Sequence, residues 1–218
     1  METNNSTQVK IQTADPSAIG LFGLAMVTLV ASSQKLGLTE GVSFIIPWAL
    51  FLGGIAQLFA CVQDAKHNNI FGTTAFGAFG LFWFGVGTSW LIQLGFFGEK
   101  LAANADPKQL GVAFIGYLIF SIFMTIGAME THKVLFFIFV FIDFLFIGLS
   151  LSTFGIFHDA TQMLAAIAEL MISLLSFYGS AAIVLNTHFG QVVLPIGKPF
   201  GIFKKHNQAP SSSNQKIA

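Results

Sequence analysis

Six long apolar stretches, separated by short polar connectors, run along the chain. A transmembrane helix needs about 20 mainly apolar residues, because each residue rises about 1.5 Å and the hydrocarbon core is about 30 Å thick. The pattern therefore predicts an all-α integral membrane protein with six transmembrane helices in a domain spanning 15–200. The polar segments 1–14 and 201–218 are predicted to be disordered. The predicted spans are Pro16–Gln34, Gly41–Val62, Gly72–Phe97, Gln109–Met129, Val134–Phe157 and Gln162–Thr187.

Composition supports this fold class. Hydrophobic residues make up 54% of the chain and charged residues 9%, whereas soluble domains carry about 25% charged residues. The formal net charge of zero offers no basic surface, so we expect a lipid bilayer and no nucleic acid as a partner. The five histidines are dispersed and Cys61 is the single cysteine. We therefore expect neither a metal site nor a cofactor.

The lysines are unevenly divided between the two sides of the predicted bundle. Six spans put both termini on one side, together with the second and fourth connectors. Seven lysines fall on that side and three on the other (Lys10, Lys66, Lys133, Lys198, Lys204, Lys205 and Lys216 against Lys35, Lys100 and Lys108). By the positive-inside rule, both termini are predicted to be cytoplasmic, in a multi-pass protein of the plasma membrane.

Glycines are concentrated in the second and third spans. Gly72, Gly80 and Gly87 lie seven or eight residues apart, which puts them on one helical face. Such a face lets a neighbouring helix approach closely. A pore wall that holds backbone close to a small solute is the other interpretation.

Four segments of the chain resemble a known family, in the right order and on the right spans. The resemblance, from about Asp15 to Gly197, is to the acetate uptake transporter family, which includes bacterial succinate–acetate permeases and fungal acetate/ammonia-export-type proteins. It implies six helices around a pore in each protomer, a homo-hexamer, and proton-linked or channel-like passage of acetate, succinate and related carboxylates. The segments are Asp15–Leu21, Gly53–Gln57, Asn69–Phe76 with Gly80–Trp83, and Val184–Asn186 with Phe189–Gly190 and Val193–Gly197.

The opening motif at the first helix consists here of Asp15, Pro16 and Gly20. The family pattern is Asn-Pro-Ala-Pro-Leu-Gly, so Asp15 replaces an Asn. An Asp-Pro pair is a good helix start, since Asp accepts from free N–H groups and Pro suits the first turn. A helix N-terminus also attracts anions, but the carboxylate of Asp15 would compete with a bound anion.

The resemblance implies a pore constriction at Leu24, Phe79 and Ile142. Phe79 takes the place of a Tyr, so the gate is apolar and favours the neutral acid or closes by dewetting. Gln57 is predicted to contact either the solute or a neighbouring helix. Thr28, Thr73, Thr74 and Asn186 are weaker candidates of the same kind.

Two carboxylates, Asp143 and Glu169, lie inside predicted spans. A carboxylate in the membrane costs about 2.5–3.5 kcal/mol on insertion scales. Both fall near mid-depth on consecutive helices, and no Lys or Arg lies inside a predicted span. They are therefore a candidate proton site, in which a carboxyl pair holds one exchangeable proton. The alternative is a protonated acid that bonds to a neighbouring helix or across a protomer interface.

These features favour proton-coupled uptake of a small carboxylate. The alternatives are a passive channel for acetate, acetic acid or ammonia, and a sensor or assembly protein without transport. No serine lies in a nucleophile-elbow motif and no phosphate-binding loop is present. We therefore expect neither an enzyme nor an ATP-driven pump.

Overall fold

The computed structural model describes residues 14–203, which fold into α-helices and one π-helix. We predicted disorder for 1–14 and 201–218, and of these segments residues 1–13 and 204–218 lie outside the described residues. The elements are α1 (Ser17–Lys35), α2 (Ile45–Trp48), the π-helix η1 (Ala49–Ala56), α3 (Gln57–Lys66), α4 (Ile70–Gln93), α5 (Glu99–Ala103), α6 (Pro107–Ala128), α7 (Lys133–Thr153) and α8 (His158–Phe189).

Six helices in the described chain are long and apolar enough to cross a membrane. The second of them joins α2, η1 and α3 into one continuous rod, Ile45–Lys66. The predicted all-α class with six transmembrane helices is confirmed. The short helix α5 lies in the connector that we predicted as Gly98–Lys108.

The third and fifth predicted spans extend several residues past the C-terminal ends of α4 and α7, and a glycine explains each of these two differences. α4 stops at Gln93 because Gly95 adopts φ +74°, and α7 stops at Thr153 because Gly155 adopts φ +75°. Residues with a positive φ end a helix by turning the chain, and glycine does so without a steric cost. Conversely, α8 is longer than predicted, with 32 residues.

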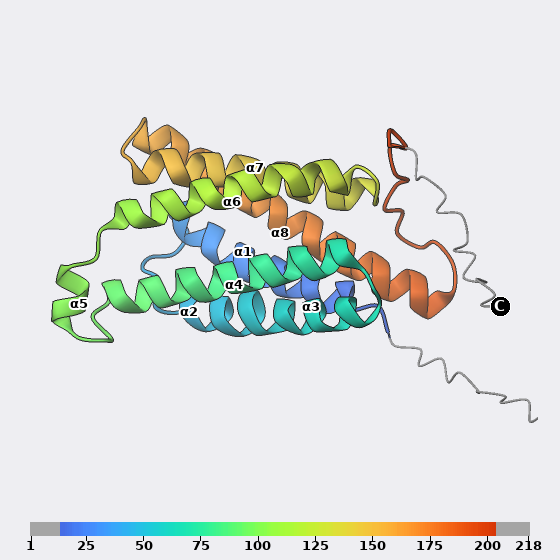
Figure 1. Cartoon of the computed structure of the whole chain (residues 1–218), viewed down its shortest axis with the longest axis horizontal. Coiled ribbons are helices and arrows are strands. Elements are labelled where there is room, and N and C mark those ends of the chain that lie inside the picture. Colours follow the sequence, from blue (N-terminus) through green and yellow to red (C-terminus); the bar gives the residue numbers. More distant parts are fainter. Residues whose placement is uncertain (1–13, 204–218) are drawn as a thin grey trace, which may run out of the picture.

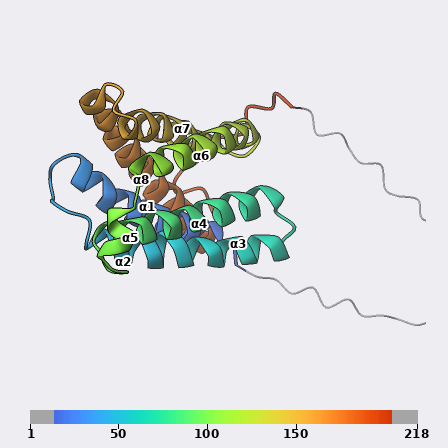
Figure 2. The ribbon, with the colours of Figure 1, turned by 60° about the vertical axis from the view of Figure 1, so that its left-hand side comes forward.

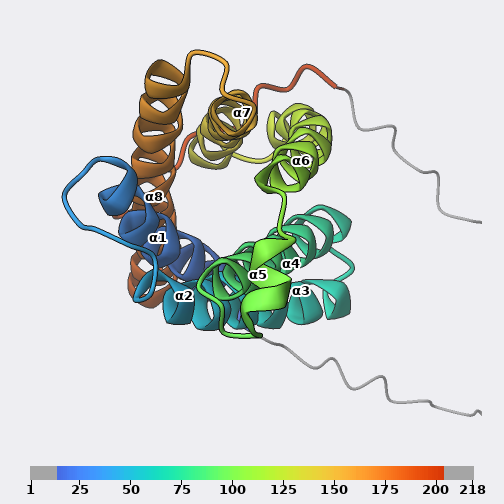
Figure 3. The same cartoon turned by 90° about the vertical axis from the view of Figure 1, so that its left-hand side faces the viewer.

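The six long helices surround a common axis (Figure 3). The ends of the described chain lie at one end of the bundle, on the right in Figure 1, and α5 lies at the other. We call these the terminus side and the distal side. α3 pairs with α4, and α6 with α7 (Figure 2). α8 packs between α1 and α7, whereas α4 and α6 touch at few points.

The glycine face of α4 packs against the second span. A Cβ on Gly80 would lie 3.2 Å from the Gly54 carbonyl, and one on Gly87 would lie 3.0 Å from Leu50. Gly53 in turn faces the ring of Trp83, 2.5 Å from where its Cβ would be. Close helix packing thus accounts for Gly80 and Gly87, as small residues do in membrane bundles.

Serine hydroxyl groups of α8 form hydrogen bonds to the neighbouring helix α1. Ser173 donates to the carbonyl of Ala25, and Ser180 donates to the carbonyl of Ala18, each over 2.8 Å. Inside a bilayer such interhelical bonds contribute about 0.6 kcal/mol on average. They fix the register of the two helices that carry Lys35 and Glu169.

The chain after α8 folds back over the terminus side. The Val134 amide donates to the carbonyl of Ile196, and the Phe200 amide donates to the carbonyl of Met129. Asn186 holds the turn, because its side chain accepts from the amides of Val193 and Leu194. This predicted substrate candidate therefore has a structural role in the turn.

Candidate functional site

Three cavities follow one another along the axis of the bundle. The terminus-side cavity has a volume of about 270 Å³, the middle cavity about 10 Å³ and the distal cavity about 190 Å³. The first two share Leu24, Phe79 and Ile142 in their walls. The last two share Phe82, Trp83 and Leu145. Adjacent cavities thus meet at shared side chains and form a row from one side to the other.

The three residues implied as a constriction come together at the narrowest part of this row. Leu24 of α1, Phe79 of α4 and Ile142 of α7 are all buried. A cavity needs about 10–15 Å³ to hold one water molecule, so the middle cavity has no room for a carboxylate. The row is closed at its centre. That these side chains limit passage remains a prediction.

Aromatic rings surround Phe79 and fix its position. Its ring lies 5.8–6.3 Å from the rings of Tyr117, Phe120, Phe139 and Phe146, measured between centroids. The Tyr117 hydroxyl donates to the Ala78 carbonyl over 3.0 Å. The polar atom of these aromatic side chains is therefore bonded to the backbone of α4. The surface at the closure is therefore apolar.

The terminus-side cavity contains one polar group without a partner. Gln57 begins α3 directly after the π-helix η1 and is 1% exposed. Its Nε2 atom is buried and has no hydrogen-bond partner among the described residues, although the side chain lines the cavity. π-helical segments often occur at functional sites. An unpaired N–H donor of this kind suits an anion or a water molecule.

Polar side chains also surround the mouth of this cavity, namely Asp15, Ser17, Asn69, Thr131 and His132. Asp15 is exposed, and its Oδ1 accepts from the Ser17 amide over 2.9 Å. Pro16 immediately precedes α1, and its carbonyl accepts from Gly20. Gly20 lies so close to Phe76 that a Cβ would clash. Asp15 thus accepts one free N–H at the start of α1, whereas the N-cap position itself is Pro16, which has no side-chain bond. Asp15 also gives this mouth a negative charge.

His132, which the sequence placed in a connector, is part of the cavity wall. Its Nδ1 accepts from the Leu135 amide over 3.1 Å and caps α7. Burial lowers the pKa of His132, and the nearby carboxylate of Asp15 offsets part of that effect. The acceptor role of Nδ1 agrees with a neutral ring whose proton is on Nε2.

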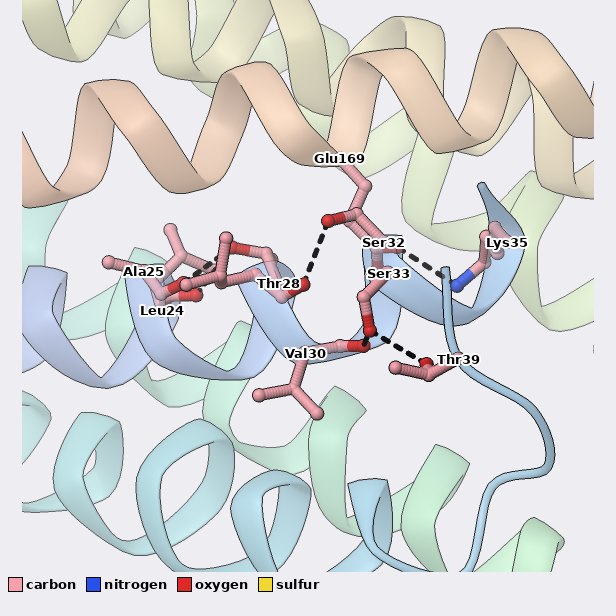
Figure 4. Close-up of polar contacts among 10 residues, drawn as sticks. Leu24, Ala25, Thr28, Val30, Ser32, Ser33, Lys35, Thr39 and Glu169 are labelled. Atoms are coloured by element: carbon pink, nitrogen blue, oxygen red, sulfur yellow. Dashed lines mark hydrogen bonds and ion pairs between the residues drawn. The ribbon is translucent and has the colours of Figure 1, made fainter. Parts of the chain in front are cut away.

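The distal cavity holds an ion pair between Lys35 and Glu169 (Figure 4). The two atoms, Nζ of Lys35 and Oε2 of Glu169, are 2.9 Å apart, and the side chains are 15% and 2% exposed. Both line the cavity together with Trp83, Trp90 and other apolar side chains. The expectation that no cation could neutralise Glu169 is therefore wrong, because α1 extends to Lys35 and its long side chain reaches inward.

Asp143 has different partners from Glu169. Its two carboxylate oxygens accept from Ser121 and Thr125 of α6. Asp143 is absent from the walls of the three cavities, whereas Ile142 beside it is present. Asp143 and Glu169 therefore do not form a carboxyl pair in this structure, because Asp143 bonds to α6 and Glu169 bonds to Lys35 of α1.

The weaker threonine candidates differ in position. Thr28 lines the middle cavity, and its hydroxyl donates to the Leu24 carbonyl over 2.7 Å. The hydroxyl of Thr73 is buried without a partner among residues 14–203. Thr74 is exposed. Only Thr28 of these three contributes to the row of cavities.

The fold is that of a helical membrane protein with six candidate spans, and its row of cavities is closed at the centre by apolar side chains. The chain matches the model of the GPR1/FUN34/yaaH family over residues 1–198, and it belongs to that family. The resemblance seen in the motifs is confirmed.

Several relatives have names that describe carboxylate transport. The chain is 32% identical to the succinate-acetate/proton symporter SatP of Escherichia coli (strain K12) over 187 residues, which is 85% of this chain and 96% of SatP. It is 26% identical to acetate permease A of Emericella nidulans, over 64% of this chain and 49% of the permease. Its structure matches that of the bacterial acetate channel SatP with a TM-score of 0.79 and 32% identity, over 85% of this chain and 100% of the other.

Proposed function

We propose that this protein moves acetate and related short carboxylates, succinate among them, across the plasma membrane by proton-coupled uptake. The observation that carries the proposal is the row of three cavities with its apolar closure at Leu24, Phe79 and Ile142. The named relatives support the same substrate class. We assign no catalytic step and no cofactor to the chain.

Proton coupling is supported by the apolar closure. A free acetate anion crossing it would lose its hydration and gain no cation in return, which is costly in a medium of low dielectric constant. A proton that travels with the anion removes that charge. The alternative is a passive channel for the anion, for acetic acid or for ammonia. The small volume of the closure favours a gated route in either case.

We further propose that the protein assembles as a homo-hexamer with one pore in each protomer and with both termini in the cytoplasm. Large apolar side chains on outward faces of several helices support an oligomer or a lipid contact, since both cover apolar surface. Examples are Phe51, Phe59, Leu81 and Phe123. Native mass spectrometry in a mild detergent tests the hexamer, and monomers alone would contradict it.

A flux assay with the purified protein in liposomes tests the function. Labelled acetate should accumulate against its gradient when the outside is acidic, and a protonophore should abolish the accumulation. Flux that only follows the acetate gradient would select the passive channel. If flux does not exceed that of protein-free liposomes, both transport functions are excluded and a sensor or assembly role remains.

A further inference from the structure

We propose that Lys35 and Glu169 form a proton-controlled binding site for a carboxylate anion in the distal cavity. The substrate carboxylate replaces that of Glu169 as the partner of Lys35 when Glu169 takes up a proton. This inference rests on the proposed function, because it assigns a binding place to the same substrate.

The pair is part of the pathway and not of the outer surface. Lys35 is the last residue of α1, and Glu169 lies within α8, where the two helices pack side by side (Figure 4). Glu169 is almost completely buried, with 2% of its side chain exposed, while the Lys35 side chain is 15% exposed. An ion entering from the distal side therefore meets the ammonium group of Lys35.

Among residues 14–203, Lys35 is the only lysine in the walls of the three cavities of this row. The terminus-side mouth carries the carboxylate of Asp15 instead. A carboxylate ligand needs a cation or several N–H donors when it leaves water. The distal cavity is thus the place in this row where an acetate anion finds a full positive charge.

The charge state of Glu169 decides whether that positive charge is available. With Glu169 ionised, the pair is neutral, and a bound acetate would add an uncompensated negative charge to a nearly apolar chamber. With Glu169 protonated, Lys35 keeps its charge and lacks a counter-ion, which is unfavourable in a buried site. An acetate carboxylate then restores the balance. One proton and one anion therefore bind together with no change in net charge.

This coupling is reciprocal by thermodynamic necessity. If protonation of Glu169 strengthens acetate binding, then bound acetate strengthens the binding of that proton by the same factor. The cavity has the volume for such a ligand, since about 190 Å³ is more than ten times the volume of about 10–15 Å³ that a cavity needs to hold one water molecule. The rings of Trp83 and Trp90 supply apolar contact for a methyl group.

Among residues 14–203, no titratable side chain other than Lys35 and Glu169 lines the distal cavity. α4 and α7 contribute only apolar side chains to the distal cavity, namely Phe82, Trp83, Val86, Trp90, Leu145 and Leu149. Asp143 of α7 bonds to α6 instead. Asp106 lines a separate recess on the distal side, next to Leu110. Within residues 14–203, Lys35 is therefore the charged group that faces Glu169.

Acetate binding to the purified full-length protein, followed by tryptophan fluorescence, tests the proposal. Trp83 and Trp90 line the cavity, so ligand binding there should change their emission. Between about pH 6 and about pH 8 acetate itself stays ionised, because carboxylic acids have pKa values near 4. Wherever Glu169 is ionised in the empty protein, the wild-type Kd should rise about tenfold per pH unit, since binding requires one proton.

Two variants separate the roles of the pair. Glu169→Gln leaves Lys35 without its carboxylate, so acetate should bind with the same Kd at every pH in this range. The double variant Lys35→Gln with Glu169→Gln removes both charges without leaving one unpaired, and it should lose the fluorescence response. Lys100→Gln, which removes an exposed lysine of α5 on the same side, is the matched control and should bind as the wild type does. Acetamide, a neutral probe of similar size, should not compete.

A wild-type Kd that does not rise with pH would overturn the inference, as would a Glu169→Gln variant that keeps the tenfold dependence. Acetate binding by the double variant with wild-type affinity would overturn it as well. These outcomes can occur while liposomes that contain the wild-type protein still take up acetate, and in that case the proposed function stands. A wild type without acetate flux would instead contradict the proposed function itself.

Discussion

Phe79 of α4 stacks on Phe146 of α7, with ring centroids 6.3 Å apart and ring planes 13° from parallel. Both rings line the middle cavity. A stacked pair of this kind contributes about 0.5–1.5 kcal/mol beyond the burial of its area. The same contact therefore supports the fold and fills the narrowest part of the row of cavities.

Replacing Phe79 should widen the closure. Phe79→Ala removes a ring from a cavity that holds at most one water, so acetate flux should rise severalfold and larger carboxylates should enter. The variant should also lose about 3–5 kcal/mol of stability, the usual cost of a Phe→Ala change in a core. Phe79→Tyr should keep acetate passage. Flux of acetate and of longer carboxylates in liposomes measures this, and unchanged size selectivity in the alanine variant would remove Phe79 from the constriction.

Membrane topology is tested by reporters on the two sides of the bundle. A reporter fused after Lys204 should lie in the cytoplasm, because more lysines fall on the terminus side. One inserted at Asn104, which follows α5 on the distal side, should lie outside. The same side for both reporters would contradict the six crossings.

The six helices could be predicted from sequence because each is a long apolar stretch between polar connectors. The partner of Glu169 could not, since Lys35 is 134 residues away along the chain and looked like the edge of a connector. His132 was likewise assigned to a connector, although folding brings it to a cavity wall. The constriction residues came from the family resemblance and not from any local pattern. Long-range contacts of this kind depend on how helices pack, which hydrophobic periodicity does not encode.

Asp143 and Glu169 should respond differently to neutralisation. Asp143→Asn keeps an oxygen that can accept from Ser121 or Thr125, so we now expect its pH-dependent uptake to stay close to wild type. Glu169→Gln should weaken that dependence by removing the proposed proton site. Uptake at matched expression, measured over the same pH range, makes the comparison. If Asp143→Asn loses the pH response and Glu169→Gln keeps it, the proton site has been assigned to the wrong carboxylate.

His132 should make stability depend on pH. Its pKa is lowered by burial, so between that pKa and the unfolded value of about 6.5 the unfolded chain binds more protons. The stabilisation from the neutral ring is therefore present above about pH 6.5 and is lost as pH falls below it. His132→Asn keeps a capping acceptor for α7 without this titration. Thermal melts in detergent should show a smaller loss of Tm on acidification than in the wild type, and equal losses would exclude His132 as the cause.

Gln57 offers a test in which stability and transport change in opposite directions. Its Nε2 is buried without a partner in the described part of the chain, and an unsatisfied polar group of this kind costs about 1–3 kcal/mol. Gln57→Leu has a similar size and no polar atoms, so its Tm should equal or exceed that of the wild type. If the amide donates to the carboxylate in the terminus-side cavity, the same variant should lower acetate uptake severalfold. Gln57→Glu keeps the shape and adds a negative charge, and it should lower uptake further at neutral pH. Thr74→Val, at an exposed threonine of α4, is the control and should change neither quantity. A leucine variant with a lower Tm and normal uptake would show instead that Gln57 serves helix packing.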